Sequence, residues 1–202
     1  AEGGDDEVGL MVNTMMQQMT LDRFRMVCNR LCAVKFALMG ALLLNNATKQ
    51  AVRVLFLGDF LNLAEHGIFT LVVLCPGVLS TKTVDLFYAV FLLISALYVL
   101  PGVSEPGGLI WTLGLTNLQV AALHVGRTRG RAVMPLNLLY VITTSLAIVA
   151  NRNALNMPAV LPAMLQLTLA LAVLPCLRTL ELGMEAAIRQ GLEVNATKEL
   201  LA

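Results

Sequence analysis

Four polar side chains of the types that carry acid–base or ligand chemistry lie close together in an otherwise apolar stretch. Asp59, Asn62 and His66 are spaced i, i+3 and i+7, which places them on one face of a helix, and Glu65 lies beside them. Lipid cannot solvate an ionisable group, so such residues at membrane depth indicate a functional position. The stripe can line a path for a proton or an ion, bind a metal centre through His66, or pack against polar groups of another helix.

A second polar stripe, Thr112, Thr116 and Gln119, follows the spacing i, i+4 and i+7. Hydroxyl and amide groups in lipid bond across helices, with about 0.6–2 kcal/mol for each contact, so we expect helix–helix polar contacts here. Both histidines of the chain, His66 and His124, fall inside or at the ends of apolar segments. They are our candidate ligands for a chlorophyll, another pigment or a haem. No residue spacing predicts a site for a bare metal ion.

These residues need a scaffold, and the composition indicates one that lies in a membrane. Of the 202 residues, 57% are hydrophobic and 13% are charged, whereas a soluble domain is about half apolar and about a quarter charged. A net charge of +1 gives no sign of the strongly basic surface that nucleic-acid binding needs. We therefore predict an all-α integral membrane protein whose partners are lipids and other membrane subunits, and not nucleic acid.

Apolar segments close to the length of about 20 residues that crosses a hydrocarbon core of about 30 Å recur along the chain. They predict about six transmembrane helices, over residues 27–44, 52–74, 84–100, 108–125, 132–150 and 157–177. Short polar connections make consecutive helices antiparallel, as in an up-and-down bundle. The chain then divides into a polar tail with an amphipathic N-terminal helix (1–26), a transmembrane bundle (27–177) and an amphipathic C-terminal helix (178–202).

Each terminal helix has an apolar face of its own. In the N-terminal helix, apolar residues recur at helical spacing, which suits a helix that lies on the membrane or on a partner. This stripe comprises Met11, Val12, Met15, Met16 and Met19. In the C-terminal helix, the apolar face comprises Leu177, Leu180, Met184 and Ile188, and the charged face comprises Glu181, Glu185 and Arg189.

Three features complicate the spans. Lys35 lies inside the first span, where its charge is costly unless it snorkels or faces protein. Residues 48–66 have a second interpretation, in which they lie on the membrane surface with the polar stripe in water. Pro162 should kink or loosen the first turns of the sixth span.

The basic residues favour one orientation through the positive-inside rule. The three arginines of residues 127–131 place that loop on the side where insertion begins, together with both chain ends. Lys49, Arg53 and Arg152 fall on the opposite side as exceptions.

Two cysteines, Cys28 and Cys32, lie one helical turn apart. They could share a metal or a disulfide, but our first interpretation is that they are small buried apolar residues.

No catalytic motif is recognisable in the chain, so we do not expect an enzyme. Aromatic residues make up 5% of the chain, which leaves little of the usual interfacial belt and indicates that other subunits cover the surface. The acidic start of the sequence suits an imported organellar protein. We expect a non-catalytic, structural subunit of a photosynthetic or respiratory membrane complex, in the thylakoid or mitochondrial inner membrane, with a pigment or lipid bound.

Two other functions stay open. The spans could form the input module of a sensor or receptor, with the C-terminal helix leading to a signalling domain. They could also form a transporter or channel whose pathway is the stripe of Asp59, Asn62, Glu65 and His66.

Overall fold

The computed structural model describes residues 2–49, 57–103, 109–126, 133–151, 158 and 160–201, and every regular element in this part of the chain is helical. The elements are α1 (Glu2–Lys49), α2 (Leu57–Leu74), the short 3₁₀ helix η1 (Pro76–Val78), α3 (Val84–Leu97), α4 (Leu109–Gly126), α5 (Val133–Ala150) and α6 (Val160–Leu201). The predicted all-α class is therefore confirmed for these residues.

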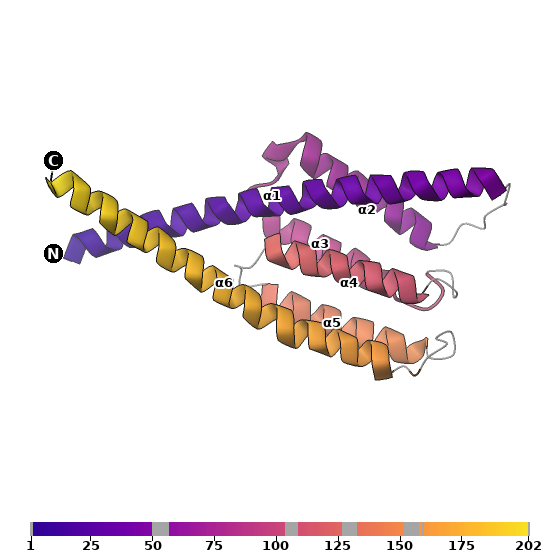
Figure 1. The fold of residues 1–202 in the computed structure, drawn as a ribbon. Helices are drawn as coiled ribbons and strands as arrows, with labels where there is room; N and C mark the ends of the chain where they lie inside the picture. The colour runs from indigo at the N-terminus through magenta and orange to yellow at the C-terminus, as the bar shows by residue number, and fades with distance from the viewer. Residues whose placement is uncertain are drawn as a thin grey trace.

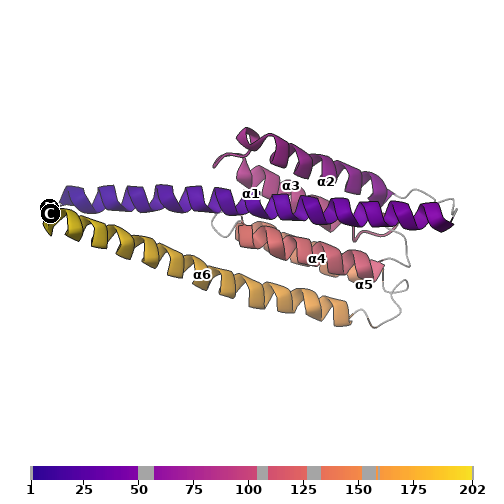
Figure 2. The same cartoon turned by 45° about the horizontal axis from the view of Figure 1, so that its top comes forward.

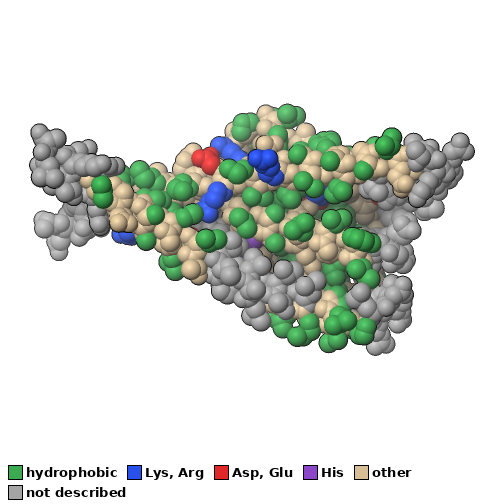
Figure 3. All heavy atoms as spheres, viewed as in Figure 1, with side chains coloured by type: hydrophobic (Ala, Val, Ile, Leu, Met, Phe, Trp, Pro, Cys, Tyr) green, Lys and Arg blue, Asp and Glu red, His purple; other side chains and the backbone are tan. Residues whose placement is uncertain are grey.

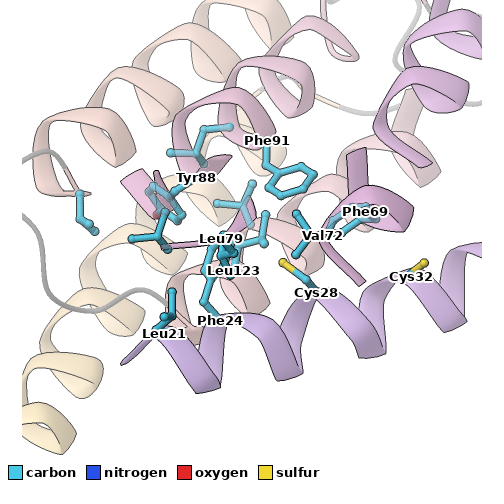
Figure 4. Packing of buried hydrophobic residues seen from close by; sticks show 14 of the residues in the cluster. Leu21, Phe24, Cys28, Cys32, Phe69, Val72, Leu79, Tyr88, Phe91 and Leu123 are labelled. Atoms are coloured by element: carbon cyan, nitrogen blue, oxygen red, sulfur yellow. The ribbon is translucent and has the colours of Figure 1, made fainter. Parts of the chain in front are cut away.

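Consecutive helices run antiparallel and form a bundle, as Figures 1 and 2 show. The helix α1 packs against α2 and α4, α3 packs against α4 and α5, and α5 packs against α6. Paired side chains give the directions. Lys35 and Phe36 of α1 contact Glu65 and His66 of α2, whereas Cys28, earlier in α1, lies beside Val72, later in α2 (Figure 4).

The first and last helices are much longer than the helices between them. The helix α1 has 48 residues and α6 has 42, which correspond to about 72 Å and about 63 Å. A membrane core needs only about 30 Å. Neither helix breaks at residues 26 or 178, where we expected separate amphipathic helices. We call residues 2–26 of α1 and 178–201 of α6 the N-terminal and C-terminal arms. Both arms leave the bundle at the same end (Figures 1 and 2).

The contacts of α1 follow a regular four-residue spacing. Leu21 apart, the residues of α1 that are at most 7% exposed recur at every fourth position: Val12, Met16, Thr20, Phe24, Cys28 and Cys32. An α-helix has about 3.6 residues per turn, so a stripe of this period winds by about 40° at each step. As the stripe winds around α1, its successive residues face different neighbouring helices, and α1 contacts α6, α4 and α2. Gly126 allows the approach of α4, because a Cβ there would lie 3.0 Å from the Cα of Phe24.

The apolar core lies where α1, α2, α3 and α4 meet. The rings of Phe69 and Phe91 stack with their centroids 4.2 Å apart. The side chains of Cys28 and Leu123 point toward the same cluster (Figure 4). Cys28 and Cys32 are buried, and burial is what we expected of them as small apolar residues.

The length and composition of several helices suit a membrane. Among the described residues, three helices are long and apolar enough to cross one, namely α1 within Gly9–Asn45, α2 and α5. The helix α3 is apolar but has only 14 residues. These findings are compatible with an integral membrane location. The expected count of six spans remains a prediction.

The helix α4 shows the reverse of the pattern of a water-soluble helix, which turns its polar side outward. Its buried positions include Thr116, Asn117, Gln119 and His124. Its exposed positions include Ile110, Trp111, Leu115, Leu118 and Val125. Such an arrangement buries polar groups and exposes apolar ones, so it favours lipid as the surrounding solvent.

Part of the polar stripe of the second span packs against protein. Residues 57–66 form the first half of α2, and Glu65 and His66 there are at most 5% exposed. The alternative that places residues 48–66 on the membrane surface stays a prediction. Residues 50–56 lie outside the described part of the chain.

The faces of the two arms differ from those expected. Val12 and Met16 are buried, whereas Met11, Met15 and Met19 are 40–52% exposed. The residues expected to form one apolar face are thus divided between a buried side and an exposed side. The reason is that Val12 and Met16 belong to the four-residue spacing through which α1 packs against the protein.

In the C-terminal arm, Leu180 is 61% exposed and Glu181 is 3% exposed, the reverse of the prediction. A salt bridge of 3.2 Å between Arg178 and Glu181 helps to compensate for the burial of that carboxylate. Pro162 falls in the first turn of α6, since the helix begins at Val160, and a missing N–H costs nothing there. The helix therefore continues through Pro162 without interruption, contrary to the kink or loosened turns that we expected.

Charged groups mark the end of the bundle from which the arms leave. Figure 3 shows that Lys, Arg, Asp and Glu side chains gather over the middle of α1 on this face. Arg25 donates through Nη2 to the carbonyl oxygens of Pro76 (2.9 Å) and Leu79 (3.1 Å). These carbonyls follow the end of α2, so the guanidinium satisfies the backbone where the chain turns.

Candidate functional site

The polar side chains of the bundle form three buried clusters. The central one is built around Glu65 of α2, whose side chain is 0% exposed. Its Oε2 forms an ion pair with Lys35 Nζ of α1, and its Oε1 accepts a hydrogen bond from Gln119 Nε2 of α4. The same Gln119 amide donates to Ser95 Oγ of α3 at 3.1 Å, and Tyr98 Oη lies 3.5 Å from Glu65 Oε2. Four helices therefore meet at one carboxylate.

The position of this cluster follows from helix lengths. Glu65 lies halfway along α2, between Leu57 and Leu74. Lys35 lies near the middle of residues 27–44, the expected first span, and the antiparallel packing of α1 and α2 brings the two charges together. If α2 crosses the membrane, this ion pair lies near the midplane, where each charge alone would be costly.

The surroundings of the ion pair strengthen it on one side. Lys35 Nζ lies 5.6 Å from the ring centroid of Phe69, a cation–π contact. Phe69 in turn stacks on Phe91. On the side that faces the arms, the pair is thus bordered by the apolar core. Apolar surroundings have a low dielectric constant, so they do not screen the attraction between the two charges as water would.

The second cluster joins α3, α4 and α5. Tyr88 Oη lies 3.0 Å from His124 Nδ1, and Asn137 Nδ2 donates to Tyr88 Oη at 2.6 Å. Asn137 Nδ2 also lies 3.0 Å from His124 Nδ1 and donates to the carbonyl oxygen of Val133 at 2.7 Å. One ring nitrogen of His124 is therefore engaged by protein groups.

The third cluster joins α4, α5 and α6. Asn117 Oδ1 accepts hydrogen bonds from Tyr140 Oη (3.0 Å) and Gln166 Nε2 (2.8 Å). Asn117 Nδ2 is buried and has no hydrogen-bond partner among the described residues. Thr116 and Thr144 bond to carbonyl oxygens of their own helices, so they add no contact between helices through these bonds.

His66 lies apart from all three clusters. Its Nδ1 lies 2.7 Å from the carbonyl oxygen of Asn62, one turn earlier in α2. Its Nε2 is buried without a partner among the residues that the structure describes. Phe36 of α1 packs edge-on against the ring, with centroids 5.6 Å apart and planes at 85°.

The predicted stripes are brought together only in part. Glu65 lies at the centre of a cluster, while Asp59 and Asn62 are half-buried toward one end of the same helix. Gln119 makes the helix–helix contacts expected of its stripe, whereas Thr116 bonds to the carbonyl oxygens of Thr112 and Leu113 in its own helix. His66 and His124 belong to different surroundings, and no contact between them is seen.

Several residues of the clusters were missed by the sequence argument. Tyr88, Asn137, Tyr140 and Gln166 all hydrogen-bond across helices. Each is a polar side chain inside an apolar span, and this property could have identified them. Lys35 was recognised as costly, and its partner Glu65 is the reason that it is tolerated.

No group of three or more His, Cys, Asp or Glu side chains suited to a metal ion occurs in the described part of the chain. The chain matches no protein-family model, no curated protein and no solved structure. Function must therefore be inferred from the contacts themselves.

Proposed function

We propose that this chain is a non-catalytic integral membrane subunit that assembles with other proteins of a larger complex. In this proposal all six long segments cross the membrane, and the two arms project on the side where insertion begins. The basic residues near that boundary, including Arg25, Lys82 and Arg178, fit the positive-inside rule. An energy-converting membrane, thylakoid or mitochondrial inner, is the location that we favour.

One observation carries the proposal. In the N-terminal arm, α1 presents a row of exposed methionines. They are Met11 (52%), Met15 (41%), Met19 (40%) and Met26 (61%). At about 100° per residue they lie within an arc of about 80°. We call them the methionine row.

In this proposal the span of α1 is residues 27–44, so the methionine row precedes the span and lipid tails do not cover it. Exposed apolar rows outside a membrane mark surfaces that another protein covers, and methionine is common at surfaces that adapt to a partner. The buried clusters support a structural role, since their hydrogen bonds and ion pairs join the helices to one another.

The test is the size of the native particle in mild detergent. We expect the wild-type protein to elute in a particle far larger than 21.8 kDa plus detergent. Replacing Met15 and Met19 by Glu should release it as a small particle. The matched control replaces Asn13 and Gln17 by Glu, two exposed positions of the same arm on another face, and should leave the large particle intact.

Two results would overturn the proposal. One is a wild-type protein that elutes from its native membrane as a small, stable monomer. The other is a variant with both glutamates in the methionine row that stays in the large particle as well as the control does.

A second candidate, the input module of a sensor, is favoured by the continuity of α6. This helix runs from the bundle into the C-terminal arm without a break, so a shift in the bundle would move the whole arm. A parent gene whose reading frame continues into a soluble signalling domain would support this function, and a stop codon after residue 202 would contradict it.

A further inference from the structure

Methionine is concentrated in the N-terminal arm. Five of the ten methionines of the chain lie within residues 11–26, four of them in the methionine row and the fifth at Met16. Leucine, which has a similar helix propensity, would give the arm an equally apolar surface. What methionine adds is a flexible side chain and a sulfur atom that can be oxidised.

The side chains of the methionine row are open to reagents in water, whereas that of their neighbour is not. Members of the row are 40–61% exposed, but Met16 is 0% exposed although it follows Met15 directly. One residue turns a helix by about 100°, and this step places Met16 in the stripe through which α1 packs against the protein. The arm therefore holds accessible and inaccessible thioethers side by side in the sequence.

Hydrogen peroxide oxidises a thioether by transferring one oxygen atom. A sulfur lone pair attacks one peroxide oxygen, the O–O bond breaks and an S–O bond forms. The proton on the transferred oxygen moves to the leaving hydroxide, which departs as water. Sulfur loses two electrons and the peroxide gains two. The product, methionine sulfoxide, is polar and chiral where the thioether was apolar.

Sulfoxides in the methionine row would change association without changing the fold. On the free arm, water satisfies the new acceptor oxygen, and the contact stripe of α1 with Val12, Met16 and Thr20 stays buried as before. Under an apolar partner surface, the same oxygen loses its water and gains no donor, which is costly. Oxidation disrupts methionine-rich interfaces in this way.

We propose that the methionine row is an oxidation site, and that its conversion to sulfoxides by hydrogen peroxide prevents the unassembled chain from joining its complex. This inference rests on the proposed function, because the row must be the surface that the partner covers. A bound partner shields the row, so oxidation acts before assembly.

The block is reversible. A thiol-dependent sulfoxide reductase restores the thioether, as two thiols become a disulfide and the sulfoxide oxygen leaves as water.

The first measurement locates the oxidation. The full chain, purified in mild detergent, is treated with dilute hydrogen peroxide, and the sulfoxide at each methionine is followed over time by mass spectrometry of fragmented peptides. Every member of the row should oxidise at least about tenfold faster than Met16, which reacts only when the arm opens locally. Equal rates at Met15 and Met16 would overturn the inference.

The second measurement follows assembly. After the peroxide is removed, the tagged chain is mixed with solubilised native membranes that lack it, and the size of its particle is measured. Oxidised chain should enter the large particle at least about tenfold less than untreated chain. Treatment with two reductases, one for each sulfoxide epimer, should restore its entry.

The matched control keeps the row apolar but removes its sulfur. It combines Met11→Leu, Met15→Leu, Met19→Leu and Met26→Leu, and it leaves every other oxidisable residue in place. This variant should enter the large particle with or without peroxide treatment.

The outcomes separate the inference from the proposed function. Entry of oxidised wild type at the untreated level, or loss of the leucine variant after peroxide, refutes the inference and leaves the proposed function standing. An untreated wild type that enters no large particle refutes the proposed function, and the inference fails with it.

Discussion

The ion pair between Lys35 and Glu65 should be the polar contact on which the stability of the bundle depends most. The Glu65 side chain is 0% exposed and that of Lys35 is 15% exposed. Replacing Lys35 by Met leaves a carboxylate that only Gln119 and Tyr98 can stabilise. Replacing Glu65 by Gln leaves a buried ammonium beside the ring of Phe69.

The magnitude follows from burial. Removing one member of a buried ion pair costs about 3–5 kcal/mol, since the other charge stays in a poor solvent, whereas removing both charges together is often neutral. We expect each single variant to fall in this range. Lys35→Met should be the more harmful, because the short Glu65 side chain cannot reach water as lysine can. The double variant should come within about 1 kcal/mol of the wild type.

Thermal unfolding in detergent can measure these differences. The buried thiols of Cys28 and Cys32 become reactive on unfolding, so a dye that fluoresces on reaction with thiols reports the transition. The exposed Cys75 and Cys176 are first replaced by Ser, so that only Cys28 and Cys32 can react. With about 2–4 °C per kcal/mol for a chain of this size, each single variant should lower the Tm by about 6–20 °C.

The surface pair Glu185–Arg189 provides the control. Its Nη2 and Oε1 atoms lie 3.2 Å apart, but the Arg189 side chain is 54% exposed. Arg189→Met should therefore cost less than about 1 kcal/mol. Additive losses in the double variant of Lys35 and Glu65 would refute the reasoning, because they would show that the two charges do not stabilise each other.

Three further results are expected. Gly126→Leu should lower stability by about 1–3 kcal/mol in the same thermal assay, since a Cβ there lies 3.0 Å from the α1 backbone. Gly114→Ala is the control: a Cβ there meets no atom within 4 Å, so this substitution should be neutral or stabilising by up to about 1 kcal/mol. Tyr140→Phe removes a hydrogen bond to Asn117 and should cost about 0.6–1.7 kcal/mol by unfolding in detergent; no change would show that the bond is not formed. In a variant with Cys176 replaced by Ser, a maleimide should modify Cys75 in the folded protein. It should leave Cys28 and Cys32 unmodified until denaturant is added, as counted by mass spectrometry.

The positions of the helices could be predicted well from the sequence, because apolar segments bounded by polar turns define them. The segments expected at 108–125 and 132–150 correspond to α4 at 109–126 and α5 at 133–150. The lengths of α1 and α6 could not be predicted. Both helices continue without a break from the apolar segment into amphipathic sequence. Hydropathy alone does not show where a span ends and an arm begins.

The clusters were harder to predict than the helices, for a geometric reason. Periodicity indicates which residues of one helix share a face, but not which face of another helix lies opposite. Asp59, Asn62 and His66 share a face, yet the carboxylate that joins four helices is Glu65, beside them. The partner of Glu65 lies 30 positions away, and only the packing of α1 on α2 shows it.

The three clusters have one helix in common. The side chains of α4 contribute Gln119 to the central cluster, His124 to the second and Asn117 to the third. Apolar contacts in lipid gain little over contacts with lipid tails, so they do not by themselves fix which helices pair. Directional bonds from α4 reach α2, α3, α5 and α6, while its end allows close approach of α1 at Gly126. Among the described residues, α4 has the largest set of buried polar side chains, and its bonds help to fix the register of the helices that it joins.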